Sequence, residues 1–283
     1  MPACRYSFMR ITAINGTQGK ASAVTLYETL DTAGDKKQEL LTQDYGRFAV
    51  RAVLAGMYLT LGTAFAAVAG QVAEGVAPGT GGLVFACLFG LGLFAIVVLG
   101  AELATGSMMF VSWSATRGRM PWGVALRMVA VATFYNFIGA AIVALVLSQS
   151  AKLGGIDDTH LISTLTEGKL AKPFFGAFVE AMGANFVVNM AVLGALQAKE
   201  IISKFAVILP IIAVFVGLGL EHVIANFSLF SLAFFADPRP AGFDGLHITG
   251  NWVAVWLGNF VGGGLGIGAV YAWLNQTKTS YVD

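Results

Sequence analysis

Six apolar stretches, each about 20 residues or longer, constrain the fold of this chain more than any other feature. The hydrocarbon core of a bilayer is about 30 Å thick, and a helix needs about 20 apolar residues to cross it. Of the 283 residues, 57% are hydrophobic and 12% are charged, whereas a soluble domain carries about 25% charged residues. Transmembrane β-strands would alternate over about ten residues, and these stretches do not. The sequence therefore predicts an all-α membrane protein with six transmembrane helices, at about 50–73, 82–112, 123–149, 173–197, 206–236 and 250–274.

Polar segments flank the apolar region at both ends. We predict a cytoplasmic N-terminal tail at 1–46, a transmembrane domain at 47–277 and a cytoplasmic C-terminal tail at 278–283. With both termini inside, the cytoplasmic segments carry 13 of the 17 Lys and Arg residues, as the positive-inside rule requires. The first 46 residues hold no apolar core before a cleavage site, so we expect no cleaved signal peptide. The expected location is the cell membrane, as a multi-pass protein.

Composition and motifs argue against several classes of function. A net charge of +1 provides no basic face for a nucleic acid. The two cysteines, Cys4 and Cys87, form no CxxC motif, so we expect neither a metal site nor a disulfide framework. The sequence contains no GxxxxGK[ST], GxSxG or HExxH motif. We therefore expect no cofactor and no enzymatic activity.

Two of the six stretches are too long for a straight span. The segments 82–112 and 206–236 each hold 31 residues, which is about 47 Å of helix. Small and polar residues interrupt both, as GAELATGS at 100–107 and as GLEHVIAN at 219–226. Non-helical backbone at membrane depth is tolerated only inside protein or against a wet cavity. The sequence therefore predicts two broken helices.

The two halves of the chain repeat each other. Gly-x-Glu at 100–102 recurs at 219–221, and Asn-Phe-Ile-Gly at 136–139 recurs as Asn-Phe-Val-Gly at 259–262. The separations are 119 and 123 residues. Because three spans per half is an odd number, the second half must lie upside down relative to the first. The prediction is a 3+3 inverted repeat with a transport site near the midplane, between the halves.

Few ionisable residues lie inside the apolar stretches, and such residues are functional candidates. His222 is the only histidine in a predicted span, and it can exchange a proton near neutral pH or act as a structural hydrogen-bonding group. Thr105, at the first break, can serve permeation through its hydroxyl or bond its own helix. Glu102 and Glu221 adjoin the breaks, where freed N–H groups need acceptors. We expect these two glutamates to support the broken helices rather than to contact substrate.

Other polar residues leave two interpretations open. Lys172, just before the fourth stretch, can draw anions to a pore mouth or be an ordinary interfacial lysine, and the residues alone favour the second. Asn185 and Asn226 can bond the backbone of the broken helices or a chain of water molecules. Glu180, within the fourth stretch, is either structural or in contact with substrate.

The two interrupted segments resemble the loop motifs of the formate/nitrite transporter family. The string at 100–106 is similar to the family's G-[AS]-[DE]-L-F-T-[GS], and the string at 219–226 is similar to G-F-E-H-S-[IV]-A-N. The resemblance covers about residues 45–275. Members of the family are homopentamers of aquaporin-like protomers, each with its own pore. They move small monovalent anions or their acids, namely formate, nitrite, hydrosulfide and sometimes acetate or lactate.

The resemblance also implies roles for individual residues. His222 matches the central pore histidine, Thr105 matches the threonine of the first loop, and Lys172 matches a lysine of the outer vestibule. Ala104 stands where Phe is usual, which should widen one constriction. The asparagines near the histidine match Asn185 and Asn226, and the apolar constriction positions match Phe89, Leu93, Val188 and Phe215.

An anion has to cross an apolar midplane, where a neutral acid costs far less than a charge. We predict that formate or a similar anion loses water, gains a proton by way of His222, Thr105 and water, and crosses as the acid. The alternatives are passage of the anion past a protonated His222, and nitrite, hydrosulfide, acetate or lactate as the substrate. Two other functions are a water or glycerol pore, which should carry NPA at both breaks, and an intramembrane enzyme. The enzyme would use His222 with Glu221, but adjacent helix positions point to different faces.

Overall fold

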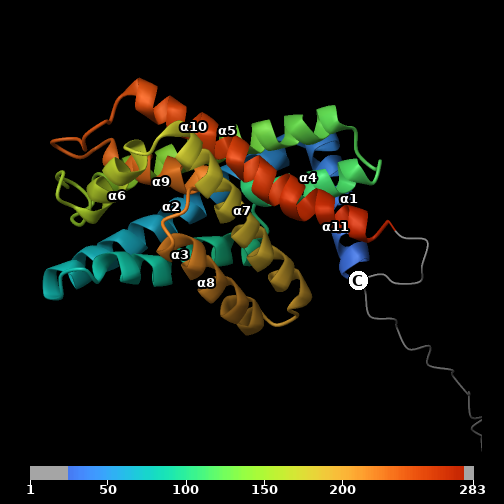
Figure 1. Cartoon of the computed structure of the whole chain (residues 1–283), viewed down its shortest axis with the longest axis horizontal. Coiled ribbons are helices and arrows are strands. Elements are labelled where there is room, and N and C mark those ends of the chain that lie inside the picture. The colour runs from blue at the N-terminus through green and yellow to red at the C-terminus, as the bar shows by residue number, and fades with distance from the viewer. Residues whose placement is uncertain (1–24, 277–283) are drawn as a thin grey trace, which may run out of the picture.

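The computed structural model describes residues 25–276, and all regular structure in that range is helical. The first 24 residues of the predicted N-terminal tail and the whole predicted C-terminal tail lie outside it. Figure 1 shows the helices gathered into one bundle. In chain order the elements are α1 (Leu26–Gln43), α2 (Tyr45–Val76), α3 (Gly81–Leu99), α4 (Ala104–Thr116), α5 (Trp122–Leu147), α6 (Leu161–Leu170), α7 (Phe174–Gln197), α8 (Ile201–Gly217), α9 (Val223–Ala233), α10 (Gly245–Asn259), the π-helix η1 (Phe260–Ala269) and α11 (Val270–Leu274).

Within the described chain, five helices are long and apolar enough to cross a membrane. They are α2, α3, α5, α7 and the continuous segment Gly245–Leu274, which α10, η1 and α11 form together. The helices α8 and α9 are also apolar, but with 17 and 11 residues they are shorter. The stretch predicted at 206–236 is thus divided between two helices, and the stretch predicted at 82–112 covers most of α3 and α4.

The ends of several helices follow local sequence signals. Gly100 and Gly219 lie just past α3 and α8, and both have a φ of +67°. Glycine adopts this left-handed conformation without the steric cost of a Cβ atom, which is why it commonly ends helices. Pro121 and Pro173 precede α5 and α7 as N-cap residues, where a fixed φ and a missing N–H do no harm. Each of the two interruptions therefore begins at a glycine that ends a helix.

Glycines let two pairs of helices pack backbone against backbone. Gly56 and Gly139 lie where α2 crosses α5, and Gly258 and Gly262 lie where the segment α10–η1 crosses α7. A Cβ atom at any of the four would lie 1.9 to 2.2 Å from a carbonyl oxygen of the facing helix. Small residues permit such close approach between membrane helices. Such close glycine contacts therefore occur in both the N-terminal and the C-terminal half of the chain.

The short helices α4 and α9 form the centre of the bundle. Every residue from Ala104 to Ala115 of α4 is buried, and in α9 all residues but Ser231 are buried. The helix α4 packs against α5, α7 and η1, and α9 packs against α2 and α5. A helix that is buried all around is enclosed by other elements. The polar backbone at the two interruptions is therefore surrounded by protein.

The helix α1 lies within the segment that the sequence predicts as a tail. Its residues Leu30 and Leu41 are buried, and it packs against α4 and α2. Asp31 accepts a hydrogen bond from the Trp113 indole (2.8 Å) and forms an ion pair with Arg117 (3.2 Å). Within the described residues, part of the predicted tail is therefore helical and packed against the bundle, and the cytoplasmic location of this segment stays a prediction.

Candidate permeation site

One buried asparagine fixes the first interruption. Asn136 donates from Nδ2 to the carbonyls of Glu102 (2.9 Å) and Ala52 (2.7 Å). Its Oδ1 accepts the N–H of Ala104 (2.9 Å), the first residue of α4. Backbone groups that leave a helix need partners when they are buried. This single side chain satisfies two such groups, at Glu102 and Ala104, and its third bond reaches the Ala52 carbonyl inside α2.

Asn259 repeats this arrangement at the second interruption. It donates from Nδ2 to the carbonyls of Glu221 (3.0 Å) and Ala181 (2.8 Å), and its Oδ1 accepts the N–H of Val223 (2.9 Å), the first residue of α9. In this register the residue after the buried glutamate is His222 in the second half and Leu103 in the first half. Leu103 and His222 therefore each lie between two backbone groups that one asparagine bonds.

Glu102 is buried and ion-paired with the N-terminal helix. Its two carboxylate oxygens accept hydrogen bonds from Lys37 of α1 (2.5 and 2.7 Å), and Oε1 also accepts one from Ser107. Arg51 of α2 donates to the carbonyl of Gly100 (2.8 Å) in the same interruption. A buried carboxylate is costly unless it is paired, so α1 supplies the charge that this interruption needs.

Glu221 is fully buried at the second interruption and faces two lysines. Its Oε1 accepts hydrogen bonds from Lys169 (3.0 Å) and Lys172 (2.8 Å), and its Oε2 accepts one from Asn226 (2.6 Å). Lys172 also donates to the carbonyl of Gly219 (2.7 Å). At both interruptions a buried glutamate is thus paired with a lysine, and another basic side chain donates to the carbonyl of the glycine. These basic residues are Arg51 at Gly100 and Lys172 at Gly219.

The two lysines differ in how many donors they have left. An ammonium group has three N–H donors. Lys172 uses all three, on Glu180, Gly219 and Glu221. Lys169 donates to Glu221 and to no other acceptor in the described part of the chain. Lys169 therefore keeps two donors for a solute, whereas Lys172 does not.

His222 and Thr105 meet at the centre of the bundle. The distance from His222 Nε2 to Thr105 Oγ1 is 2.8 Å, and both side chains are buried. On the other side of the ring, Nδ1 accepts the N–H of Ala225 (3.2 Å) and caps α9. A ring nitrogen that accepts an N–H carries no proton of its own. This geometry therefore holds the neutral imidazole, with its proton on Nε2 and directed at Thr105.

An opening of about 470 Å³, lined by Lys169 and Lys172, leads toward this pair, and we call it the lysine vestibule. Phe89 and Phe215 line it, and they also line a central cavity of about 10 Å³ that His222 borders. The two phenyl rings meet edge to face, with centroids 5.7 Å apart. A single water molecule needs about 10–15 Å³. The central cavity thus holds one water at most, and the two rings close it toward the vestibule.

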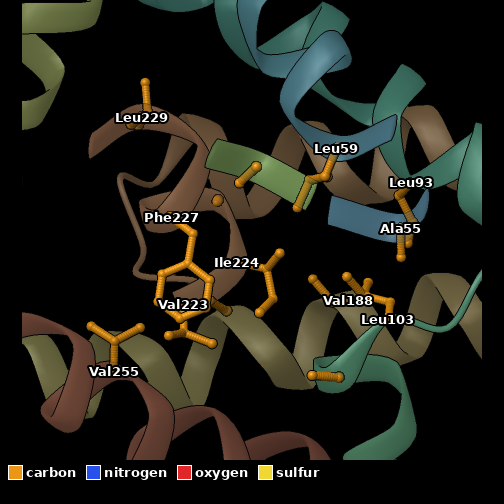
Figure 2. Packing of buried hydrophobic residues seen from close by; sticks show 14 of the residues in the cluster. Ala55, Leu59, Leu93, Leu103, Val188, Val223, Ile224, Phe227, Leu229 and Val255 are labelled. Atoms are coloured by element: carbon orange, nitrogen blue, oxygen red, sulfur yellow. The ribbon is translucent and has the colours of Figure 1, made fainter. Parts of the chain in front are cut away.

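Beyond the central cavity lies an opening of about 280 Å³ lined by Lys37, which we call the α1 vestibule. Leu93 and Leu103 line both this vestibule and the central cavity, and Val188 lines the central cavity. Figure 2 shows these three apolar side chains grouped together, from α3, the first interruption and α7. We use the word path for these two vestibules and the central cavity between them, which apolar side chains narrow on both sides and which His222 borders.

The comparison with known protein families decides how this path is classified. The sequence model of the formate/nitrite transporter family matches residues 24–273. This chain belongs to that family. The family resemblance predicted from the two interrupted motifs is thus confirmed.

Relatives with two different substrate names are similar to this chain. The formate channel FocA of Escherichia coli (strain K12) is 30% identical over 243 residues, which are 78% of this chain and 83% of FocA. The nitrite transporter NirC of the same strain is 29% identical over 245 residues, 82% of this chain and 90% of NirC. A solved FNT family ion channel has a TM-score of 0.82 and 25% identity, covering 88% of this chain and 98% of that one. A pentameric formate channel with formate bound has a TM-score of 0.67 and 26% identity, covering 81% and 96%.

The structure places most of the predicted constriction residues in one location. Phe89, Leu93, Val188 and Phe215 all line the central cavity, and their role in permeation stays a prediction. Ala104 is buried in α4 and lines none of the three cavities. The neighbouring residue Leu103 lines the central cavity and the α1 vestibule, and the widening expected from Ala104 stays a prediction.

The predicted asparagines lie near the polar pair but bond other groups. Asn185 donates to the carbonyls of Thr105 (3.1 Å) and Asn259 (2.8 Å). Asn226 donates to Glu221 and to Asn251 (2.8 Å). Both therefore brace the interruptions, and no bond joins either of them to the His222 ring in the described structure.

Sequence reasoning missed three residues that line the path. Lys37 lies between Leu30 and Leu41, and the spacing of these residues is that of a helix. This spacing could have predicted α1. Lys169 lies three residues before Lys172, so both lysines were candidates for the outer vestibule. Leu103 lies inside the quoted motif, but only the backbone course shows that it lines the cavity.

Short polar contacts order the loop that leads into α6. Asp157 accepts hydrogen bonds from the Thr159 hydroxyl (2.7 Å) and from the N–H groups of Thr159 and His160 (2.9 and 3.2 Å), and these bonds lower the pKa of Asp157. Burial lowers the pKa of His160. Its Nδ1 accepts the N–H of Ile162 in the first turn of α6 (3.2 Å). The loop thereby fixes the start of the helix that carries Lys169.

Proposed function

We propose that this chain is a membrane channel or transporter for formate or a similarly small monovalent anion. The observation that carries the proposal is the path of two vestibules and a central cavity, in which His222 lies between two apolar constrictions. The relatives named as a formate channel and a nitrite transporter support the same class of solute. Nitrite is the first alternative substrate, followed by hydrosulfide, acetate and lactate.

We infer that the chain crosses the membrane six times as a 3+3 inverted repeat. In this arrangement α3 and α4 form the second span as one broken helix, and α8 and α9 form the fifth. The matching bonds of Asn136 and Asn259 support this, since each ties the start of a short helix to the buried glutamate before it. The glycine contacts of α2 with α5 and of α7 with α10–η1 add a second correspondence between the halves.

The assembly and the orientation follow from two further arguments. One of the similar solved structures is described as pentameric, so we propose a homopentamer in which each protomer has its own path. The excess of Lys and Arg on the side of the termini supports a cytoplasmic location of both termini. The α1 vestibule then opens to the cytoplasm, and the lysine vestibule opens to the outside.

The lysine vestibule attracts the anion through the two unused donors of Lys169. Near Phe89 and Phe215 the anion loses water, which raises its affinity for a proton. It takes that proton from a hydronium ion of the outer solution, which leaves a water molecule behind, and it passes as the neutral acid while the aromatic rings move aside. His222 then donates its Nε2 proton as a hydrogen bond to the passing acid.

A proton relay through His222 itself needs a further change. A proton can be added to the neutral ring only at Nδ1, and that atom accepts the N–H of Ala225. The relay, and likewise the passage of an anion past a protonated His222, would first have to break this cap. We therefore favour hydrogen-bond donation by a neutral His222 over the proton relay that the sequence suggests.

The decisive experiment is uptake of labelled formate into proteoliposomes at an external pH of about 5 and about 7, on either side of the ordinary histidine pKa. We expect uptake that rises at the lower pH and collapses with a protonophore. Nitrite, hydrosulfide, acetate and lactate as competitors would rank the substrates. The variant His222→Phe should lose this uptake, and unchanged uptake would remove His222 from the mechanism.

Two other outcomes would redirect the proposal. If nitrite or hydrosulfide moves and formate does not, the class of solute stands and the preferred substrate is wrong. If no small anion moves at either pH, the proposed function fails. An enzymatic use of His222 with Glu221 lacks support, because the Glu221 carboxylate bonds Lys169, Lys172 and Asn226.

A further inference from the structure

A second carboxylate, on α7, bonds one of the lysines that line the vestibule. Glu180 accepts a hydrogen bond from Lys172, and its side chain is 35% exposed, compared with 0% for Glu221. Lys172 lies between the two glutamates and is itself 25% exposed. Lys172 therefore bonds one carboxylate inside the protein and one that solvent reaches.

The charges around the vestibule cancel only because of Glu180. Two lysines line the vestibule, and neither carboxylate is among its lining residues. Glu221 balances one ammonium group and Glu180 balances the other. Without Glu180 the cluster would carry one net positive charge next to the path.

Lys172 has contacts that would hold it in place without Glu180. It donates to the carbonyl of Gly219 (2.7 Å) and to Glu221 (2.8 Å), both within the second interruption. A glutamine at position 180 has nearly the same shape and keeps an oxygen that can accept from Lys172. The charge of residue 180 can thus be removed while the geometry of the interruption stays the same.

Resting on the proposed function, we propose that Glu180 sets the affinity of the lysine vestibule for its anion by cancelling the charge of Lys172. Lys172 is a positioning residue, fixed on Gly219 and Glu221, and Lys169 offers its unused donors to the anion. A carboxylate at the entrance repels an incoming anion and lowers its local concentration, and salt screens this effect because the group is partly exposed.

The test compares Glu180→Gln with wild type by the concentration dependence of labelled formate uptake. We expect the half-saturating concentration to fall about two- to fivefold at low salt, the range expected for one partly exposed charge, with little change in the maximal rate. At high salt the difference should shrink. The variant Glu180→Ala removes the same charge without a hydrogen-bond acceptor, and it should change the half-saturating concentration in the same direction.

Two further variants make the test specific. Glu167→Gln is the matched control, since Glu167 lies on α6 two residues before Lys169 and forms no ion pair in the described structure. It should leave the half-saturating concentration unchanged. Lys172→Gln keeps a donor for the Gly219 carbonyl and should raise that concentration, and the double variant with Glu180→Gln should return it toward the wild-type value.

Several outcomes would overturn the inference while leaving the proposed function intact. These are an unchanged half-saturating concentration in Glu180→Gln, an equal effect of Glu167→Gln, or a loss of maximal rate and thermal stability without a change in affinity. If wild type takes up none of the small anions, the proposed function itself fails. The two failures are therefore distinguishable in one set of measurements.

Discussion

Replacing Asn259 by leucine tests how far the second interruption depends on one side chain. Asn259 is fully buried, and leucine has the same number of side-chain heavy atoms with the same branching, so the change removes hydrogen bonds without opening a cavity. The Glu221 carbonyl and the Val223 N–H lose their partner, whereas the Ala181 carbonyl lies inside α7 and keeps a helical donor. Each orphaned backbone group costs about 1–3 kcal/mol. The expected loss of stability is therefore about 2–6 kcal/mol.

The assay is the apparent Tm of the purified protein in detergent, read as the assembled fraction that survives heating. At about 2–4 °C per kcal/mol, Asn259→Leu should lower the apparent Tm by at least about 4 °C. Asn136→Leu should do the same at the first interruption. Thr63→Val is the control, because Thr63 is equally buried but only donates to the Leu59 carbonyl in its own helix (2.8 Å). The reasoning is refuted if Asn259→Leu and Thr63→Val have the same apparent Tm.

Leu103→Ala should open the constriction toward the α1 vestibule and raise uptake of lactate relative to formate several-fold, and an unchanged ratio in competitive uptake would contradict this. Gly263→Ala would place a Cβ atom 2.2 Å from the Asn185 amide nitrogen, an overlap that costs about 1–3 kcal/mol. The yield of assembled protein should fall, whereas Gly266→Ala, with its nearest neighbour at 3.4 Å, should be tolerated; equal yields would argue against this. Burial lowers the pKa of His160 in the folded chain. As the pH falls below the ordinary histidine pKa of about 6.5, the unfolded chain therefore takes up the proton before the folded chain does. The stability that is present above that pH is lost as the pH falls toward the lowered pKa of the folded chain. Between about pH 7 and pH 5 the apparent Tm of wild type should fall more than that of His160→Asn, and parallel curves would show that His160 does not contribute.

The positions of the two interruptions could be predicted because their signals are local. Gly100 and Gly219 end helices through a backbone angle that other residues rarely adopt. The glutamates two residues later stand out because charges are rare in apolar stretches. The sequence also paired Asn136 with Asn259, although it could not show that each bonds the start of the following short helix.

The identity of the vestibule cation could not be predicted in the same way. Lys169 and Lys172 are both compatible with an outer lysine, and the family resemblance implied Lys172. The structure distinguishes them by their acceptors, since Lys172 has three and Lys169 has one in the described chain. The acceptors of Lys172 come from α7 and from the second interruption, so only the folded chain brings them to one lysine.

The sequence by itself determined that this chain is an apolar, all-helical protein of the formate/nitrite transporter family, with two glycine-marked interruptions. Hydrophobic length and backbone preference are properties of short segments, so they can be read residue by residue. Only the tertiary structure decided that Leu103 rather than Ala104 lines the path, and that Lys37 pairs with Glu102 across 65 residues of chain. Those outcomes depend on the direction in which a side chain points and on which distant segment lies opposite it, and packing of the whole bundle sets both.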